Sequence, residues 1–167
     1  MREWLSRAYD PNMKASNYRV VPLPTEVAEN ARRNAHAGAT DHAYVTADSP
    51  TGYPCRHCLR WAQPGEKLVL FPYASIPPGR PYSETGPIFV HAQPCARYQA
   101  TEEYPADLRT GRTFRAYNAA QEIIAAEPVA TSDPESVIAK LFAHPETEFL
   151  QARSADRGCY TFGIIRA

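Results

Sequence analysis

Three pieces of one segment, YPCRHCLRW (53–61), KLVLF (67–71) and PIFVH (87–91), decide the fold of this chain. The last two are short apolar runs rich in β-branched and aromatic residues, which predicts two strands. Pro64-Gly65 forms a turn before the first strand, so the CxxC sequence lies in a turn region and not in a long helix. The prolines of SIPPGRPYSETG (75–86) predict an irregular loop between the strands. Together these pieces predict a CxxC turn followed by a hairpin.

Further elements are predicted on both sides of this segment. Runs rich in β-branched and aromatic residues predict strands over residues 18–23, 44–47, 112–117, 122–129, 148–153 and 159–166. Helices are predicted from Pro24-Thr25 to Gly38 and from Asp133-Pro134 onward, because proline or a capping residue opens each helical pattern. A third, short helix is predicted from Pro94 through Cys95 to Tyr98.

These elements lack the regular strand–helix–strand alternation of a doubly wound fold. The sequence therefore predicts an α+β fold, a single domain over residues 17–167 with a mostly antiparallel sheet of short strands and two or three helices. Residues 1–16 are predicted to form an N-terminal arm or a short helix. A chain of 167 residues is long enough to bury a core without disulfides.

The charge balance argues against several classes of function. The 18 basic and 18 acidic residues give a formal net charge of 0, with no basic footprint for nucleic acid or an anionic membrane. No apolar run approaches the roughly 18 residues of a membrane span, and MREWLSRAYDP is too charged for a secretory signal. We therefore expect a cytoplasmic protein with no nucleic-acid or membrane partner. Its four cysteines then suggest metal binding, thiol chemistry or core packing.

Two short-spaced pairs of sulfur and nitrogen ligands point to a metal. Cys55 and Cys58 form a CxxC pair, and His91 and Cys95 form an HxxxC pair. Zinc takes four thiolate or imidazole ligands in a tetrahedron, and chains usually supply them as two such pairs. A CxxC turn, a hairpin and a ligand on the first turn of a helix is also the order of treble-clef zinc sites. We predict that these four residues bind zinc, which requires the Cys55 and Cys95 sulfurs to lie roughly 3.5–4 Å apart.

Two other interpretations of the thiols stay open. A redox or nucleophilic CxxC is favoured by Arg56 and His57, which would lower the thiol pKa values, although the long helix of a thioredoxin-like site is missing. Alternatively the cysteines only pack in the core, since free cysteine is among the most buried residue types. Core packing is our expectation for Cys159, and His57 is expected at most to cap a turn.

The loop RPYSETG (80–86) leads into the strand that carries His91. Long ordered loops beside candidate ligands often contact substrate, and Glu84 with His91 is a candidate acid/base pair. Arginine holds carboxylates and phosphates in bidentate fashion, and the candidate substrate-binding residues are Arg56, Arg60, Arg80 and Tyr82, with Arg97 as a further arginine. Surface ion pairs are the alternative for each charged residue.

Several strings resemble a small bacterial family of unknown function: YPCRHCL (53–59), Gly65-Glu66, PYSETGPIFVH (81–91) and Cys95, with support from Arg115-Ala116-Tyr117 and Gly158-Cys159. The likeness extends from about Tyr18 to the end of the chain. Members of that family typically have a Tyr-Arg-Pro-Phe run in the strand after Gly65-Glu66, whereas residues 71–74 here read FPYA and lack that arginine. The resemblance implies a bacterial, cytosolic protein, suggests a biosynthetic role, and assigns no catalytic residue.

Two functional hypotheses follow. The first, which we favour at this point, is a small zinc-dependent enzyme with an open coordination position that acts on a small polar, anionic molecule. The second is a non-catalytic domain with a structural zinc or buried thiols, which binds a partner or ligand through residues 76–98. A small-molecule ligand is expected in either case, and the reaction and the oligomeric state stay open.

Overall fold

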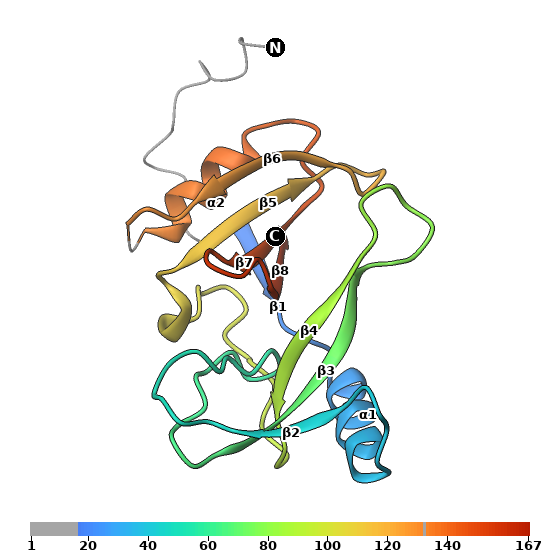
Figure 1. Cartoon of the computed structure of the whole chain (residues 1–167). Helices are drawn as coiled ribbons and strands as arrows, with labels where there is room; N and C mark the ends of the chain where they lie inside the picture. The colour runs from blue at the N-terminus through green and yellow to red at the C-terminus, as the bar shows by residue number, and fades with distance from the viewer. Residues whose placement is uncertain (1–16, 132) are drawn as a thin grey trace.

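The computed structural model describes residues 17–131 and 133–167, and within them it contains two α-helices and eight strands in two antiparallel sheets (Figure 1). The elements follow one another in the order β1 (Tyr18–Val21), α1 (Thr25–His36), β2 (Ala43–Thr46), β3 (Lys67–Ile76), β4 (Glu84–His91), β5 (Arg112–Tyr117), β6 (Ile123–Pro128), α2 (Pro134–Phe142), β7 (Phe149–Ser154) and β8 (Tyr160–Arg166). A single α+β domain was predicted, and that class is confirmed. The arm or helix predicted over residues 1–16 lies outside the described residues.

The two sheets have separate cores. The larger sheet has the strand order β1-β8-β7-β5-β6, and its core includes Phe114, Leu150, Phe162 and the buried face of α2. The smaller sheet has the order β2-β3-β4, and α1 packs on β3. The core of the smaller sheet contains Cys55 and Cys58 beside apolar residues of α1, β3 and β4. The candidate ligands are therefore part of this second core.

The sequence explains how each helix is placed. Asp133 caps α2 by accepting the Ser136 backbone N–H at 3.2 Å, and Pro134 occupies the first turn, where a missing N–H costs nothing. Helix α1 has no side-chain cap, but its buried face consists of Ala28, Ala31 and Ala35. Such small side chains let the helix axis lie close to β3, which brings the neighbouring Arg32 toward the end of β4. No helix in the described part of the chain is long and apolar enough to cross a membrane.

The hairpin of β3 and β4 is longer than predicted. Strand β3 continues through Pro72 to Ile76, and Pro72 lies opposite Pro87 of β4. Because β2 pairs with β3 only as far as Leu70, this part of β3 is an edge, and the outer side of β4 is paired only by the isolated bridge at Phe89. Proline is tolerated at a sheet edge because no ladder partner needs its missing N–H. The irregular loop is therefore only residues 77–83, and Glu84 lies in a strand.

The short helix predicted from Pro94 to Tyr98 is wrong. Residues 94–100 form no helix, and their polar groups are held by other segments of the chain. The Tyr98 N–H donates to the His57 carbonyl at 2.9 Å, and Arg97 donates to the carbonyls of Leu23 and Pro22 at 3.1 and 2.7 Å. These tertiary hydrogen bonds replace those of a helical turn. Cys95 therefore lies in an extended segment, and the chain lacks the helix of a treble-clef site here.

Candidate metal centre

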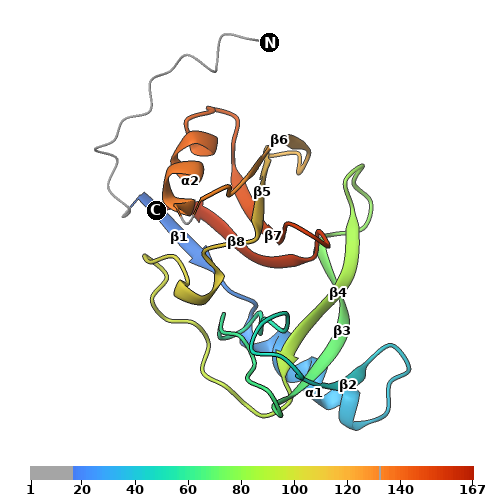
Figure 2. The same ribbon diagram turned by 60° about the vertical axis from the view of Figure 1, so that its left-hand side comes forward.

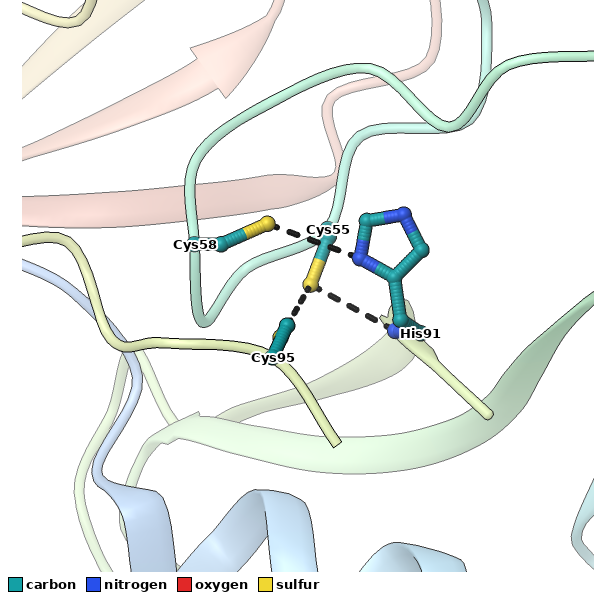
Figure 3. A group of neighbouring side chains, drawn as sticks. All are labelled: Cys55, Cys58, His91 and Cys95. Carbon is teal, nitrogen blue, oxygen red and sulfur yellow. Dashed lines mark hydrogen bonds between the residues drawn. The ribbon is translucent and has the colours of Figure 1, made fainter. Parts of the chain in front are cut away.

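The four predicted ligands converge. The ligand atoms of Cys55, Cys58, His91 and Cys95 all lie within 4.8 Å of one another, which makes a group that could hold a metal ion (Figure 3). The Sγ atoms of Cys55 and Cys95 are 3.8 Å apart, and the Cys58 Sγ lies 3.5 Å from His91 Nδ1. A tetrahedral zinc with Zn–S about 2.3 Å and Zn–N about 2.0 Å requires S···S about 3.8 Å and S···N about 3.5 Å. The separations therefore fit a tetrahedral ion.

The backbone fixes the CxxC turn against the end of β4. The Leu59 N–H donates to the Cys55 carbonyl at 2.9 Å and closes the turn, with Leu59 in the left-handed region at φ 57. Cys55 forms an isolated bridge with Phe89, and the Arg56 N–H donates to the Phe89 carbonyl at 3.0 Å. His91 ends β4, and its own N–H points at the Cys55 Sγ at 3.4 Å. A backbone N–H aimed at sulfur stabilises the thiolate form that a metal needs.

Burial makes the centre nearly closed to solvent. Cys55 is 0%, Cys58 6% and His91 7% exposed, while Cys95 is partly exposed. Hydrogen bonds with Cys58 and Cys95 lower the pKa of Cys55, and hydrogen bonds with Cys55 and Cys58 raise the pKa of Cys95. Hydrogen bonds to Cys55 and Cys58 also raise the pKa of His91 to about 10. Buried thiols and an imidazole that contact one another in this way are groups that a divalent cation can bind.

Two residues outside the ligand set, Arg32 and His57, contact it directly, and the role of Arg32 was not predicted. Arg32 of α1 donates to the His91 carbonyl at 2.9 Å and to the Cys95 Sγ at 3.6 Å. His57 lies 3.3 Å from the Cys95 Sγ through Nδ1 and 2.9 Å from the Thr25 hydroxyl through Nε2. His57 was expected either to lower the thiol pKa values or only to cap a turn; it is 2% exposed and links α1 to the cluster. In the sequence, the only sign of this role was the position of His57 between Cys55 and Cys58.

Glu66 completes the surroundings of His91. Its Oε2 lies 3.4 Å from His91 Nε2, an ion-pair distance, although the angles do not make a hydrogen bond. Nδ1 is the ring nitrogen that faces Cys58. With a metal on Nδ1, the opposite N–H faces a carboxylate, which is the usual outer partner of a ligand histidine.

The expected acid/base pair is not brought together. Glu84 begins β4 and His91 ends it, so they lie about 23 Å apart at roughly 3.3 Å per residue. Glu84 instead accepts hydrogen bonds from Arg115 at 2.9 Å and from Arg153 at 2.8 Å. Figures 1 and 2 show the tip of the hairpin at the end remote from α1. The loop with the exposed Arg80 and Tyr82 therefore does not face the metal cluster.

The other predicted binding residues have different surroundings. Arg60 is exposed, and a hydrogen bond to Cys58 raises the pKa of its guanidinium. Arg56 is 3% exposed, points away from the cluster, and donates to the carbonyls of Tyr160 at 2.8 Å and Pro54 at 2.7 Å. The expectation that Cys159 packs in the core is wrong, because its thiol is partly exposed in the turn before β8.

Comparisons with known proteins give one match. The model of a family described as "Protein of unknown function (DUF1203)" matches residues 52–166. No curated protein and no solved structure matches the chain. The matched range contains all four candidate ligands and strands β3 to β8. It begins after α1, later than the start near Tyr18 that the resemblance suggested. Because the match covers more than half of the sequence, the chain belongs to the DUF1203 family, whose function is unknown.

Proposed function

We propose that the protein is a zinc-binding domain in which the ion is structural, the second of the two hypotheses. The observation that carries this proposal is the closed geometry of the cluster. Four protein ligands lie within 4.8 Å of one another, two of their separations match tetrahedral values, and three of the ligands are less than a tenth exposed. Structural zinc sites have four protein ligands, whereas catalytic sites have three and keep a position for water or substrate.

The ligand types favour zinc over other ions. Three thiolates and one imidazole are soft ligands, which argues against magnesium and calcium, and a tetrahedral arrangement of sulfur and nitrogen is typical of zinc. Three thiolates around a divalent ion leave a net charge of −1. The Arg32 guanidinium, 3.6 Å from the Cys95 Sγ, offsets that charge. The surroundings therefore suit a zinc–thiolate centre electrostatically.

The ion would connect segments that the sheet does not join. The ligands come from the CxxC turn, the end of β4 and the extended segment after it. Apparent binding free energies of structural zinc reach about 10–16 kcal/mol in small domains, which is comparable to the entire stability of a typical domain. We therefore expect the zinc to hold the CxxC turn, including Arg56, in its folded position.

The catalytic alternative rests on Cys95. It is the only partly exposed ligand, so a substrate would have to replace this thiolate to reach the ion. Its contacts with Arg32 and His57 argue against easy replacement. Under this alternative the expected acid/base residue Glu84 has no part, because it lies at the far end of β4.

Metal analysis of protein purified without a tag tests the proposal. About one zinc per chain is expected, and less than about a tenth of an equivalent would contradict it. Cobalt(II) substitution then separates a structural from a catalytic ion. In a closed site the visible spectrum of the cobalt protein stays unchanged when azide or cyanide is added. A change that saturates with azide would mean an open coordination position and would favour the enzyme.

A further inference from the structure

A cavity of about 600 Å³ lies between the two sheets, separate from the metal centre. Its wall comes from residues 51–61, strands β3 and β4, residues 107–112, and residues 154–159 around the turn between β7 and β8. Apolar surface is contributed by Leu70, Pro87, Phe89 and Trp61. Small-molecule sites are typically clefts of this size, with apolar walls and a few converging polar groups.

Arg112 is the polar group in this wall that lacks a partner. It is only 4% exposed, yet its Nε has no hydrogen-bond partner among the described residues. Its guanidinium lies 5.5 Å from the centre of the Trp61 ring. Burial lowers the pKa of Arg112, because a charge is costly to remove from water, and attraction to Tyr104 and Asp156 offsets only part of that effect.

Arg153 shows how this fold treats a buried arginine that is structural. It is 2% exposed, and its guanidinium donates to Glu84, the Gly158 carbonyl, Ser75 and Gln151 at 2.6–2.9 Å. Arg153 lies on β7 opposite Thr113, the residue next to Arg112 on β5. The Nε of Arg153, like that of Arg112, has no hydrogen-bond partner among the described residues, so the two buried arginines differ only in the surroundings of their terminal nitrogens. One is surrounded by acceptors of the chain, and the other lines an open space.

A second buried arginine lines the same cavity. Arg56 donates to carbonyls of the chain through Nε and Nη1. Of its five N–H donors, the two on Nη2 remain for a ligand. Its guanidinium lies 5.8 Å from the centre of the Phe89 ring. Each arginine is therefore placed against one aromatic ring of the wall, an arrangement that positions a guanidinium for planar, bidentate recognition.

The acidic side chains of the wall offset the buried positive charge only in part, through the attraction of Asp156 to Arg112. Asp107 and Asp156 also line the cavity, and both are exposed. Asp107 accepts the Trp61 backbone N–H at 3.3 Å, and Asp156 lies 3.9 Å from Arg157. The acidic groups of the wall are exposed, while its buried charges, Arg56 and Arg112, are both positive.

We propose that this cavity binds a small organic anion, an aromatic carboxylate or phosphate ester, whose acidic group is bound by Arg112 and Arg56. The planar part of the ligand packs on Trp61 and Phe89. Arg112 is thereby the residue that discriminates an anion from a neutral ligand of the same shape. This inference adds a ligand site to the proposed structural zinc and does not require the zinc to be catalytic.

Calorimetric titration of the zinc-replete, full-length protein tests the site. The probes are phenyl phosphate, benzoate and, as a neutral analogue, benzyl alcohol. Either anion should bind at least tenfold more tightly than benzyl alcohol, since hydrogen bonds to charged groups are worth about a factor of ten or more. Arg112→Met should weaken binding of that anion about tenfold and leave benzyl alcohol unchanged. The matched control is Arg33→Met, which removes an exposed positive charge of α1 outside the cavity and should change the affinity less than about twofold.

Three results would overturn the proposal. They are equal affinities for the anions and benzyl alcohol, an Arg112→Met affinity within twofold of the parent, and no saturable binding of either anion at about 10 mM. If Arg112→Met does not fold, Arg112→Lys retains the charge and should still lose affinity, because lysine lacks the bidentate fork. Zinc content is measured for every variant. Arg112 contacts none of the metal ligands, so a failure of this site leaves the zinc content at one equivalent and is distinct from a failure of the zinc proposal.

Alkylation of Cys159 tests whether the anion binds in this cavity. Its partly exposed thiol lines the cavity, while the other three cysteines are metal ligands. At about ten times the dissociation constant, phenyl phosphate should slow alkylation of Cys159 by iodoacetamide about tenfold, measured by mass spectrometry. An unchanged alkylation rate at saturation would show that the anion binds elsewhere and would overturn the assignment.

Discussion

The metal centre and the cavity use the same four-residue turn in opposite ways. At the centre, Cys55 and Cys58 face His91 and Cys95, and every ligand atom has another ligand atom within 4.8 Å. At the cavity, Arg56 of the same turn faces open space beside Arg112, a buried arginine whose Nε has no partner among the described residues. The four ligands of the metal centre need only one bound ion to satisfy all of their ligand atoms, so we regard this centre as part of the folded framework. A buried charge that the chain leaves without a partner indicates a site for something that comes from outside.

This difference implies that the cavity depends on the metal centre, whereas the metal centre does not depend on the cavity. Loss of the metal should release the CxxC turn and therefore Arg56, so it should damage both sites. Loss of Arg112 should damage only the cavity, since it contacts no metal ligand. The predictions below follow this asymmetry, from the largest expected effect to the smallest.

The largest effect is expected from Cys55→Ser. Cys55 is fully buried and contacts Cys95 and His91, so its loss removes a ligand and leaves three groups without their ion. We expect zinc loss, a melting temperature lower by more than about 10 °C or failure to fold, and no anion binding. The matched control is Cys159→Ser, the same change outside the cluster, which should retain zinc and stability. A Cys55→Ser protein with full zinc content and normal melting would contradict the ligand assignment.

The next largest effect is a difference in stability between substitutions of the two buried arginines. Arg153→Met removes donors from Glu84, Ser75 and Gln151 and should destabilise the fold by about 2–3 kcal/mol. Arg112→Met removes a charge that the chain does not pair, so the ligand-free protein should be as stable as the parent or more stable. Urea unfolding of the zinc-replete variants measures both. A comparable destabilisation by the two substitutions would mean that Arg112 is structural.

A smaller effect is expected for the arginine that neutralises the metal centre. Arg32→Gln removes the cation beside Cys95, and outer contacts of this kind are typically worth about 10–100-fold in metal affinity. Competition with a chromophoric chelator should show zinc bound at least tenfold more weakly, with little change in anion binding. The control is Arg33→Gln on the exposed side of α1. If both variants bind zinc equally well, Arg32 plays no part in the centre.

The smallest effect is expected at the hairpin tip. Tyr82 is 44% exposed and lies in the loop 77–83, far from the cluster. Tyr82→Ala should change the free energy of unfolding by less than about 0.5 kcal/mol and alter neither zinc nor anion binding. A marked loss of phenyl phosphate affinity in this variant would return the ligand site to the loop that the sequence favoured.

The sequence allowed the ligand set to be predicted because ligand chemistry is local. CxxC and HxxxC are short patterns, and the two strands between them form an antiparallel hairpin, so the chain has few ways to place the pairs except together. The two helices could be predicted for the same reason, because Asp133-Pro134 and the alanine stripe of α1 are local signals. The convergence of Cys55 and Cys95 at 3.8 Å is the long-range consequence of these short patterns.

The cavity was not predictable in the same way. Trp61, Arg112 and Cys159 are far apart in the sequence and meet only when the larger sheet packs beside the CxxC turn. Proximity along the chain suggested that Glu84 serves His91, whereas a strand of eight residues places them at opposite ends. Pro94 suggested a helix, but tertiary hydrogen bonds to His57 and Pro22 decided the path of that segment. Each of these errors treated a tertiary effect as a local one.

Zinc-edge X-ray absorption of tag-free protein tests the central claim most directly, because it reports the coordination of the ion itself. We expect about one zinc per chain with three sulfur neighbours at about 2.3 Å and one nitrogen at about 2.0 Å, and no oxygen neighbour. This coordination should not change when phenyl phosphate is added. Negligible zinc, or an oxygen ligand that the probe displaces, would contradict a closed structural centre.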